Sequence, residues 1–406
     1  MLVLRNARVA TMTGPQGSAG HAPLGLLEGA AVVCEGGRIA WIGPSADAPA
    51  GEVIDAGGML LTPGFVDPHT HLIFAGDRAH EHAQRLAGAT YLEIAAQGGG
   101  IRSTVTATRG ASDDELLAGA RGRLARLARS GVTTVEVKTG YGLSVEDELR
   151  LLRIAVALGR EGPCEVVPTL LGLHAVPPGI DRAQWVAQVV EELTPRAARE
   201  GARGCDAFFE QGAFTAAECR AALEAGAREG LAPHLHADQL TAGGGAELAA
   251  ALSCASADHL ERTGAAGVRA MQRAGTAAVL LPLAAWFLRE KAASAAPFLE
   301  AGVPVALGSN INPGSQRIES VSMLLAAGCL LSGLTPAQAL WACTAGGAKA
   351  LRLDDRGRLQ PGLRADLVLF STADPDHLPY HAGVEHAALV VRGGEVVQAL
   401  SASRPD

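Results

Sequence analysis

The sequence predicts an α/β protein: a (β/α)8 barrel of the TIM type with a small β domain built from both chain ends. Short apolar β-runs alternate with helical segments rich in Ala, Leu, Arg and Glu through the middle of the chain. Short β-runs separated by glycine turns occupy both ends, and histidines follow several of the central runs. Alternating strands and helices are typical of parallel βαβ units, and eight such units close into a barrel.

Length and composition indicate a large, enzyme-sized protein. The chain has 406 residues, of which 48% are hydrophobic, and a formal net charge of −8, so it lacks the positive surplus that nucleic-acid binding needs. No basic segment leads into an apolar signal core, and no apolar run is long enough to cross a bilayer. We therefore expect a cytoplasmic protein without a membrane or nucleic-acid partner. Seven scattered cysteines without Cys-x-x-Cys spacing predict reduced, mostly buried thiols.

The two chain ends are predicted to form one β domain. Residues 2–9 and 31–42 are β-runs, and Gly36-Gly37 forms a turn within the second. The other end has β-runs at residues 365–370, 387–391 and 395–399, with a hairpin turn at Gly393-Gly394. We expect residues 1–61 and 352–406 to form one composite β domain, with a surface loop at residues 13–23.

Residues 62–351 are expected to form the barrel. Its β-runs include residues 133–137, 164–170, 232–236, 277–281 and 303–307. We expect residues 60–66 to enter the barrel as its first strand and to lead into Asp67-Pro68-His69-Thr70-His71. Residues i and i+2 of a strand point to one side, so His69 and His71 would face the interior at the catalytic end of the barrel. This pair is half of a metal site, although two such close histidines are also typical of a solvated turn.

Polar residues at later strand ends favour the metal site. His236, His259 and Asn310 each follow a β-run, at the end where such barrels gather their catalytic groups. A single histidine there is more often a hydrogen-bonded structural residue. Four histidines at strand ends favour a metal centre, for which we predict His69, His71 and His236 as ligands.

Several motifs resemble a known family. Residues 63–71, the strand ends at His236 and His259, and residues 362–367 are similar to the amidohydrolase superfamily of metal-dependent hydrolases. More narrowly, the chain resembles the imidazolonepropionase family, the ring-opening hydrolases of histidine degradation. The motifs that carry this narrower resemblance run from one end of the chain to the other: residues 76–78, 85–91, 98–101, 138–143, 174–177, 236–239, 312–315 and 377–381.

The resemblance implies a (β/α)8 barrel over residues 62–351 with a β-sandwich domain formed by residues 1–61 and 352–406. It further implies a cytoplasmic homodimer with one zinc or iron ion that hydrolyses 4-imidazolone-5-propanoate to N-formimidoyl-L-glutamate. It also implies a set of substrate-binding positions, namely Arg78, Tyr141, His174, Gln239, Asn312, Gly314 and Ser315. Gln239 is counted among the catalytic positions as well, where the family has both Glu and Gln.

The chemistry of such a reaction sets requirements that these residues can meet. A cyclic amide is a poor electrophile, so a divalent ion is needed to supply a hydroxide near neutral pH and to polarise the carbonyl. His259 is the natural proton-transfer group, although it could instead only orient a ligand. A guanidinium matches the planar propanoate carboxylate, so Arg78, otherwise an ordinary solvated loop residue, is expected to bind it.

Asn310 departs from the superfamily pattern. The resemblance implies an aspartate at the last strand end, which ligates the metal and relays a proton to the leaving nitrogen. An amide cannot carry that proton, but its oxygen can still coordinate a metal, more weakly than a carboxylate. We therefore expect Asn310 to be a ligand and a catalytic position at which turnover is reduced.

Three alternatives remain open at this point. A hydantoinase or dihydroorotase would bridge two metals with a carboxylated lysine, for which Lys138 is the candidate, although its matched segment favours one metal. A purine or pyrimidine deaminase would also use one metal, but Arg78 and Tyr141 favour a substrate that bears a carboxylate. A weakly catalytic or non-catalytic ligand-binding relative would explain Asn310. Assays against a panel of substrates separate these possibilities.

Overall fold

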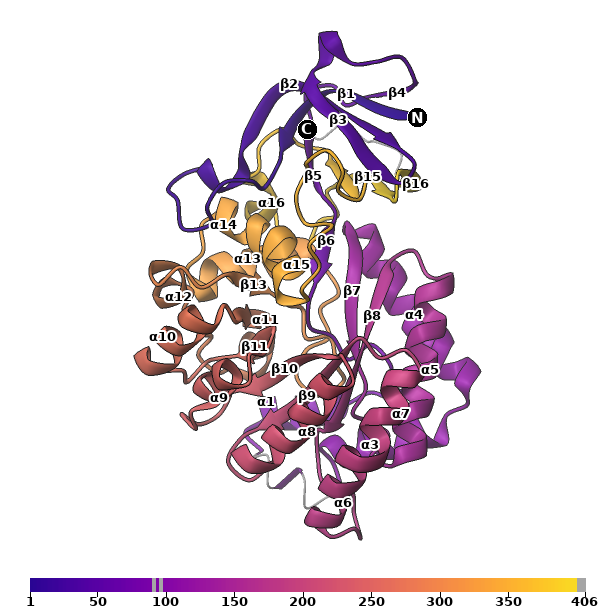
Figure 1. Ribbon diagram of the computed structural model, residues 1–406, viewed down its shortest axis with the longest axis vertical. Helices are drawn as coiled ribbons and strands as arrows, with labels where there is room; N and C mark the ends of the chain where they lie inside the picture. Colours follow the sequence, from indigo (N-terminus) through magenta and orange to yellow (C-terminus); the bar gives the residue numbers. More distant parts are fainter. Residues whose placement is uncertain (90–92, 95–97, 400–406) are drawn as a thin grey trace.

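The computed structural model describes residues 1–89, 93–94 and 98–399. It shows a parallel barrel in the middle of the chain and, at one end of it, a mixed sheet in which indigo and yellow strands lie together (Figure 1). Thr90 and Tyr91, the last two residues of the predicted motif 85–91, lie outside the described residues. No helix in the described ranges is long and apolar enough to span a membrane.

Eight parallel strands pair in chain order to form the barrel. They are β6 (Phe65–Asp67), β7 (Val132–Lys138), β8 (Glu165–Leu173), β9 (Gly204–Phe209), β10 (Ala232–Ala237), β11 (Ser256–His259), β12 (Ala277–Leu280) and β13 (Val305–Leu307). The segments after β6 and β13 are joined by two backbone hydrogen bonds, in which Asn310 donates to His69 at 2.9 Å and His71 donates to Ile311 at 3.0 Å. These bonds tie the first and last strand ends together, and the predicted barrel is confirmed.

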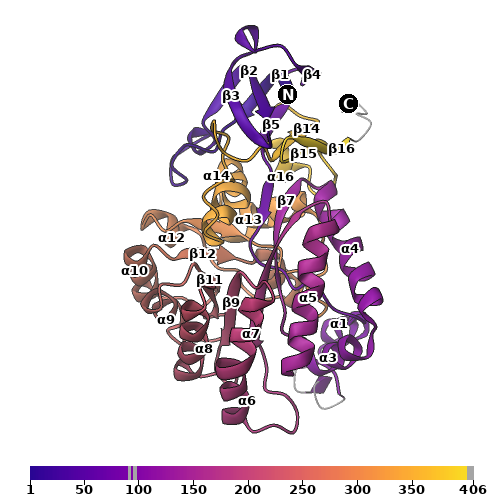
Figure 2. The same cartoon turned by 45° about the vertical axis from the view of Figure 1, so that its right-hand side comes forward.

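Helices cover the outside of the barrel (Figure 2). They are α1 (Ala79–Leu86), α3 (Ile101–Gly110), α4 (Asp113–Arg129), α5 (Val145–Glu161), α6 (Arg182–Gln188), α7 (Thr194–Arg199), α8 (Ala216–Arg228), α9 (Gly245–Ala251), α10 (Ala265–Ala274), α11 (Pro282–Leu288), α12 (Ala296–Glu300), α13 (Val321–Ser332), α14 (Pro336–Trp341) and α15 (Gly347–Ala350). Local sequence sets several of their starts. Capping boxes begin α4 at Ser112 and α8 at Thr215, where each hydroxyl accepts a backbone N–H and a glutamate reaches back.

The mixed sheet is built from both chain ends, as predicted. Its strands are β1 (Leu2–Ala10), β2 (Leu26–Glu35), β3 (Arg38–Pro44), β4 (Glu52–Asp55), β5 (Leu60–Pro63), β14 (Leu367–Phe370), β15 (Ala387–Arg392) and β16 (Glu395–Ala399). Strand β5 joins the two ends, because it pairs in parallel with β1 and antiparallel with β14. Side chains of these strands form a separate apolar core, which includes Leu4, Val32, Leu61 and Leu369. The short helix α16 (His377–Tyr380) lies between β14 and β15 in the chain.

The predicted first barrel strand is wrong in one respect, because residues 60–66 are not a single strand. Residues 60–63 form β5 of the mixed sheet, and only β6 enters the barrel. Gly64 separates the two and packs directly on Thr133, since a Cβ at position 64 would lie 2.2 Å from the Thr133 hydroxyl oxygen. The chain can therefore pass from one sheet to the other only with a glycine at this point.

The segment 13–23, predicted as a surface loop, is partly buried. Its Gln16 side chain is 7% exposed and pairs with the backbone of Val305 in β13. The amide of Gln16 donates to the Val305 carbonyl at 2.9 Å and accepts the Val305 N–H at 2.9 Å. The loop therefore ties the N-terminal part of the chain to the last barrel strand.

Candidate active site

Two histidines follow β6 at the end of the barrel. His69 is completely buried and His71 is 3% exposed. Nδ1 of His69 lies 2.6 Å from Oδ2 of Asp258, so this nitrogen donates a proton to the carboxylate and Nε2 keeps a free lone pair. Nε2 of His69 and Nδ1 of His71 are buried without a hydrogen-bond partner. Buried nitrogens of this kind need a partner, and a metal ion is one.

Two more histidines come from neighbouring strands. His236 lies in β10, and its Nδ1 is 2.9 Å from Oδ2 of Asp206 on β9. His259 ends β11, and its Nδ1 is 3.5 Å from Oε1 of Glu261. The φ angle of His259 is 81°, a conformation that is strained for a non-glycine residue and that is found preferentially at functional sites.

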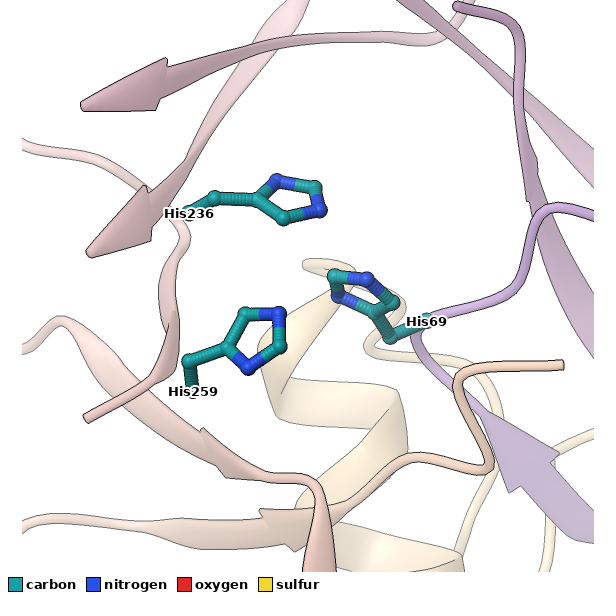
Figure 3. Close-up of side chains that lie close together, drawn as sticks. All are labelled: His69, His236 and His259. Carbon is teal, nitrogen blue, oxygen red and sulfur yellow. The ribbon is translucent and has the colours of Figure 1, made fainter. Parts of the chain in front are cut away.

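The imidazoles of His69, His236 and His259 point toward one another (Figure 3). One nitrogen of each lies within 4.8 Å of the others, close enough to bind a common ion. His71 stands beside this group, with its ring centroid 5.3 Å from that of His69 and 5.6 Å from that of His236. The structure thus brings together the four histidines that the sequence singled out, with His259 in the tightest group.

Burial keeps the imidazoles of His69 and His71 uncharged. Desolvation, followed by the positive charge of Lys138, holds the pKa of His69 well below its ordinary value. Desolvation, with His174 and His236 as further causes, does the same to the pKa of His71. A neutral imidazole has the lone pair that a metal requires, so the residues present fit a metal ion.

Asn310 follows β13 at the edge of this group. It is 2% exposed and adopts the left-handed conformation, with φ 55°. Its backbone N–H is bonded to His69, as described above, and its Oδ1 accepts a hydrogen bond of 3.1 Å from Nδ2 of Asn312. Asparagine tolerates this backbone conformation better than most residues. The residue is therefore fixed beside the histidines by the backbone and the side chain.

A buried charge cluster lies among the strands that carry these histidines. Lys138 on β7 is completely buried, and its Nζ lies 2.7 Å from Glu136, 2.8 Å from Asp206 and 3.5 Å from Asp258. Burial alone lowers the pKa of Lys138, but Asp206, Glu136 and Asp258 raise it above its ordinary value. A protonated, ion-paired lysine has no lone pair with which to carry a carboxylate. The cluster therefore disfavours the alternative of a carboxylated lysine between two metals.

Two further rings, those of Tyr141 and His174, lie beside His71. The ring of His174 stacks on His71 with centroids 5.4 Å apart, and Tyr141 lies 5.4 Å from His174 and 5.8 Å from His71. Nδ1 of His174 lies 2.9 Å from the Gly140 carbonyl oxygen. Gly140 has φ 108°, and a Cβ there would lie 2.7 Å from the same Nδ1, so this close approach requires glycine. Desolvation lowers the pKa of His174 to about 4.

Two arginines converge on Gly314. The side chain of Arg78 donates from Nε to Glu81 at 2.7 Å, and a Cβ at position 314 would lie 2.2 Å from Nη1 of Arg78. Nη2 of Arg85 donates to the Gly314 carbonyl at 2.7 Å. Arg78 also acts electrostatically on Tyr141, whose pKa is raised by burial and lowered by this arginine. The predicted positions Arg78, Tyr141 and Gly314 thus share one region.

The loop after β13 is held by Asn312. Its Oδ1 accepts the backbone N–H groups of Gly314 at 2.8 Å and Ser315 at 2.9 Å. Its Nδ2 donates to the Ser315 hydroxyl at 2.7 Å as well as to Asn310. These contacts link the arginine region to the histidines. Gln239, the remaining predicted position, is half-buried directly after β10, three residues beyond His236.

The sequence analysis missed the carboxylates Asp206 and Asp258, which contact two of the predicted ligands. A signal was present, because Asp206 is a charged residue inside an otherwise apolar β-run and Asp258 is a charged residue directly before His259 in a buried strand. Lys138 and Glu136, at positions i and i−2 of β7, give the same signal. Charges placed inside the strands of a barrel require partners inside the same barrel. The pairing of each carboxylate with a particular histidine depends on the barrel geometry.

Comparison with solved structures agrees with this fold. The 5-methylcytosine deaminase from Klebsiella pneumoniae liganded with 5-fluorocytosine superposes with a TM-score of 0.76 at 17% identity, covering 100% of this chain and 99% of that one. An atrazine chlorohydrolase TrzN mutant from Arthrobacter aurescens TC1, complexed with zinc and atraton, gives a TM-score of 0.75 at 17% identity, covering 98% and 95% of the two chains.

Sequence comparisons are more specific. The model of the amidohydrolase family matches residues 60–398. An imidazolonepropionase of Anaeromyxobacter sp. (strain K) is 53% identical over 408 residues, covering 98% of this chain and 96% of the relative. An imidazolonepropionase of Geobacillus kaustophilus (strain HTA426) is 46% identical, covering 92% and 91% of the two chains. With its barrel, its metal-competent histidines and these full-length matches, the chain belongs to the metal-dependent amidohydrolase family and, within it, to the imidazolonepropionases.

Proposed function

We propose that this chain hydrolyses the ring of 4-imidazolone-5-propanoate to give N-formimidoyl-L-glutamate, a step of histidine degradation. The observation that carries the proposal is the position of the buried histidines beside a region with two arginines and a buried tyrosine. A small planar ring with a carboxylate tail fits this arrangement, because the ring can lie at the histidines while the tail reaches the guanidinium of Arg78.

We assign one divalent ion, zinc or iron, to His69, His71 and His236, with the Asn310 side-chain oxygen as a weak fourth ligand. The unpartnered buried nitrogens of His69 and His71 support this assignment. Imidazole nitrogens suit both zinc and iron. The bound ion supplies Lewis-acid activation of water and of the lactam carbonyl. His259 lies within reach of the same position, and we assign it to proton transfer because its backbone is strained and its Nδ1 faces Glu261.

Substrate binding falls to the flanking groups. Nε of Arg78 donates a hydrogen bond to Glu81, so the terminal nitrogens of the guanidinium can bind the propanoate. Burial raises the pKa of Tyr141, so its hydroxyl stays protonated and donates a hydrogen bond. If Nδ1 of His174 donates to Gly140, its Nε2 is an acceptor for a ring N–H of the substrate. Gln239, Asn312, Gly314 and Ser315 complete the proposed substrate site.

Proton transfer then depends on His259. The imidazole accepts a proton from the attacking water, the C–N bond of the ring breaks, and the leaving nitrogen must receive a proton. Asn310 has no ionisable proton to give, so in this chain His259 delivers the same proton to the nitrogen, with Gln239 orienting the reacting groups. This single route explains why we expect slower turnover than with an aspartate at position 310.

The test combines metal analysis with an activity assay. We expect the purified chain to contain about one zinc or iron ion and to open the imidazolone ring, and we expect His69→Ala and His236→Ala to lose both properties. His21→Ala, which changes an exposed histidine paired with Asp376, is the control and should keep both. Unchanged metal content in both active-site variants would refute the assignment of the ligands, and ring opening by none of the proteins would refute the proposed reaction.

We also propose that the enzyme is a cytoplasmic homodimer, as the family resemblance implies. Exposed apolar side chains on adjacent helices support a protein interface, because Leu330 on α13 is 83% exposed and Tyr380 on α16 is 84% exposed.

A further inference from the structure

The buried charge cluster contains a residue that the proposed reaction does not use directly. Lys138, Glu136, Asp206 and Asp258 come from three strands, β7, β9 and β11, and their side chains are completely buried. Charges lose favourable hydration when they are buried, so a cluster of this kind is a poor way to gain stability alone. Its position suggests what it does instead.

Two of the carboxylates have a second partner in the metal site. Asp258 accepts a hydrogen bond of 2.6 Å from Nδ1 of His69, and Asp206 lies 2.9 Å from Nδ1 of His236. In both pairs the carboxylate lies beside Nδ1 of the histidine, which leaves Nε2 for an ion. Lys138 contacts both of these carboxylates, Asp258 at 3.5 Å and Asp206 at 2.8 Å.

Lys138 therefore stands between the two orienting carboxylates. Lys138 is the basic residue of the cluster, and the other three members are acids. Without it, Asp206 and Asp258 would be like charges in one buried region, and their repulsion would displace them from His69 and His236. Further hydrogen bonds locate each carboxylate, from Ser256 to Asp258 at 2.5 Å and from the Ala207 N–H to Asp206 at 2.7 Å. These bonds carry no charge that offsets the repulsion.

We infer that Lys138 is a positioning residue of the metal centre, which holds Asp206 and Asp258 in place so that His69 and His236 each present Nε2 to the same ion. The inference rests on the proposed function, in which those two histidines are metal ligands. It assigns a role to one of the three lysines of the chain through contacts with carboxylates, without any contact with the substrate.

The experiment measures the affinity of the metal-free protein for Zn²⁺ by competition with a chromogenic chelator. We expect Lys138→Met to weaken zinc binding roughly 10- to 100-fold, the range seen when the partners of metal ligands are removed. Lys291→Met, at an exposed lysine, is the matched control and should bind zinc as the unmodified chain does. A second measurement, the ¹⁵N spectrum of the imidazoles in the metal-free protein, should show loss of the single Nδ1–H tautomer at His69 and His236.

A second variant allows for a folding defect in Lys138→Met. Lys138→Met/Glu136→Gln removes one positive and one acidic group together, so its excess of buried negative charge is smaller than that of Lys138→Met. We expect this variant to fold, as shown by circular dichroism, and still to bind zinc more weakly than the unmodified chain. A folded variant with unchanged zinc affinity and unchanged tautomers would overturn the inference. Failure of both variants to fold would also overturn it, because Lys138 would then serve the stability of the barrel.

Failure of the proposed function gives a different result. If the unmodified chain binds no zinc or iron, the metal centre itself is refuted. If the unmodified chain binds the ion and opens the imidazolone ring while both Lys138 variants bind it equally well, only the role of Lys138 is refuted.

Discussion

Arg78 is the residue whose role is most directly testable, because its terminal guanidinium nitrogens are predicted to bind the propanoate. We expect Arg78→Ala to raise KM for 4-imidazolone-5-propanoate by roughly 10- to 100-fold, since a hydrogen bond to a charged group contributes about 1.5–3 kcal/mol. For an analogue whose tail lacks the carboxylate, KM should change little. Steady-state kinetics with both substrates measure the difference.

The control for this prediction is Arg102→Ala, which removes an exposed arginine from α3. It should leave both KM values as they are. An equal rise in KM for the charged and the uncharged substrate after Arg78→Ala would exclude Arg78 from the carboxylate site.

Asn310 supplies the second prediction at this scale. Asn310→Asp should raise kcat by roughly 10²–10⁴-fold, because an ionisable group at this position can relay a proton to the leaving nitrogen. The new carboxylate would accept the hydrogen bond that Asn312 now donates to Oδ1, so the backbone should not move. The measurement is kcat of both forms at saturating metal, so that tighter metal binding does not contribute.

Two outcomes would contradict this expectation. Equal kcat values would mean that His259 performs all proton transfer and that residue 310 only holds the ion. Absence of activity in both forms would favour a ligand-binding relative, the alternative that Asn310 left open.

At the residue scale, the sequence predicted which side chains gather but not how they are connected. His69, His236 and His259 were identifiable because they stand at or near the ends of β-runs, a local property of the chain. The contacts of Asp258 with His69 and of Lys138 with Asp206 join strands that are far apart in sequence. Such contacts depend on how the barrel closes, so a single sequence cannot specify them.

Among the elements, Glu165 at the start of β8 joins the C-terminal part of the chain to the barrel. Its carboxylate lies 3.1 Å from Arg356, 3.0 Å from Arg364 and 3.0 Å from Arg203. Partial burial alone raises the pKa of Glu165, but these arginines lower it below the ordinary value of 4.5. The ionised form is thus favoured in the folded state, and its stabilisation is present above about pH 4.5 and is lost as the pH falls through the lower folded pKa.

We therefore expect Glu165→Gln to lower the free energy of unfolding by on the order of 1–2 kcal/mol at neutral pH, with a smaller effect in acid. Urea unfolding followed by circular dichroism at pH 7 and pH 4 measures both values. Glu192→Gln, in an exposed pair with Arg196, is the control and should have little effect at either pH. A loss of stability that is the same at both pH values would show that the stabilising effect of Glu165 does not come from ion pairs with the arginines.

Element boundaries followed from the sequence where one local rule decides them. The hairpin at Gly393-Gly394 between β15 and β16 formed where it was expected. Strand β9 was not predicted, because Asp206 interrupts its apolar run and the reason for that charge lies on other strands. The division of residues 60–66 into β5 and β6 was missed as well, since the contact of Gly64 with Thr133 comes from a distant segment.

For the whole molecule, the prediction concerns association. Helices α13 and α16 contact each other, and Leu330 and Tyr380 project from them into solvent. If this surface is the proposed dimer interface, Leu330→Glu should convert the dimer into a monomer, because a charge would be buried without a partner. Size-exclusion chromatography with light scattering measures the mass.

Leu240→Glu provides the comparison, because Leu240 is 54% exposed and lies after β10. This variant should remain a dimer. A monomeric unmodified chain would refute the proposed homodimer, and a dimeric Leu330→Glu protein would place the interface elsewhere.

The pairing of β5 with β14 has a consequence for how the protein is made. Strands β1 to β5 leave the ribosome first, whereas β14 is synthesised only after the whole barrel. Until then one edge of β5 lacks its final neighbour, and an unpaired edge is a site where other chains can add. Nascent chains that stall before β14 should therefore aggregate through the N-terminal strands, even when their barrel is already folded.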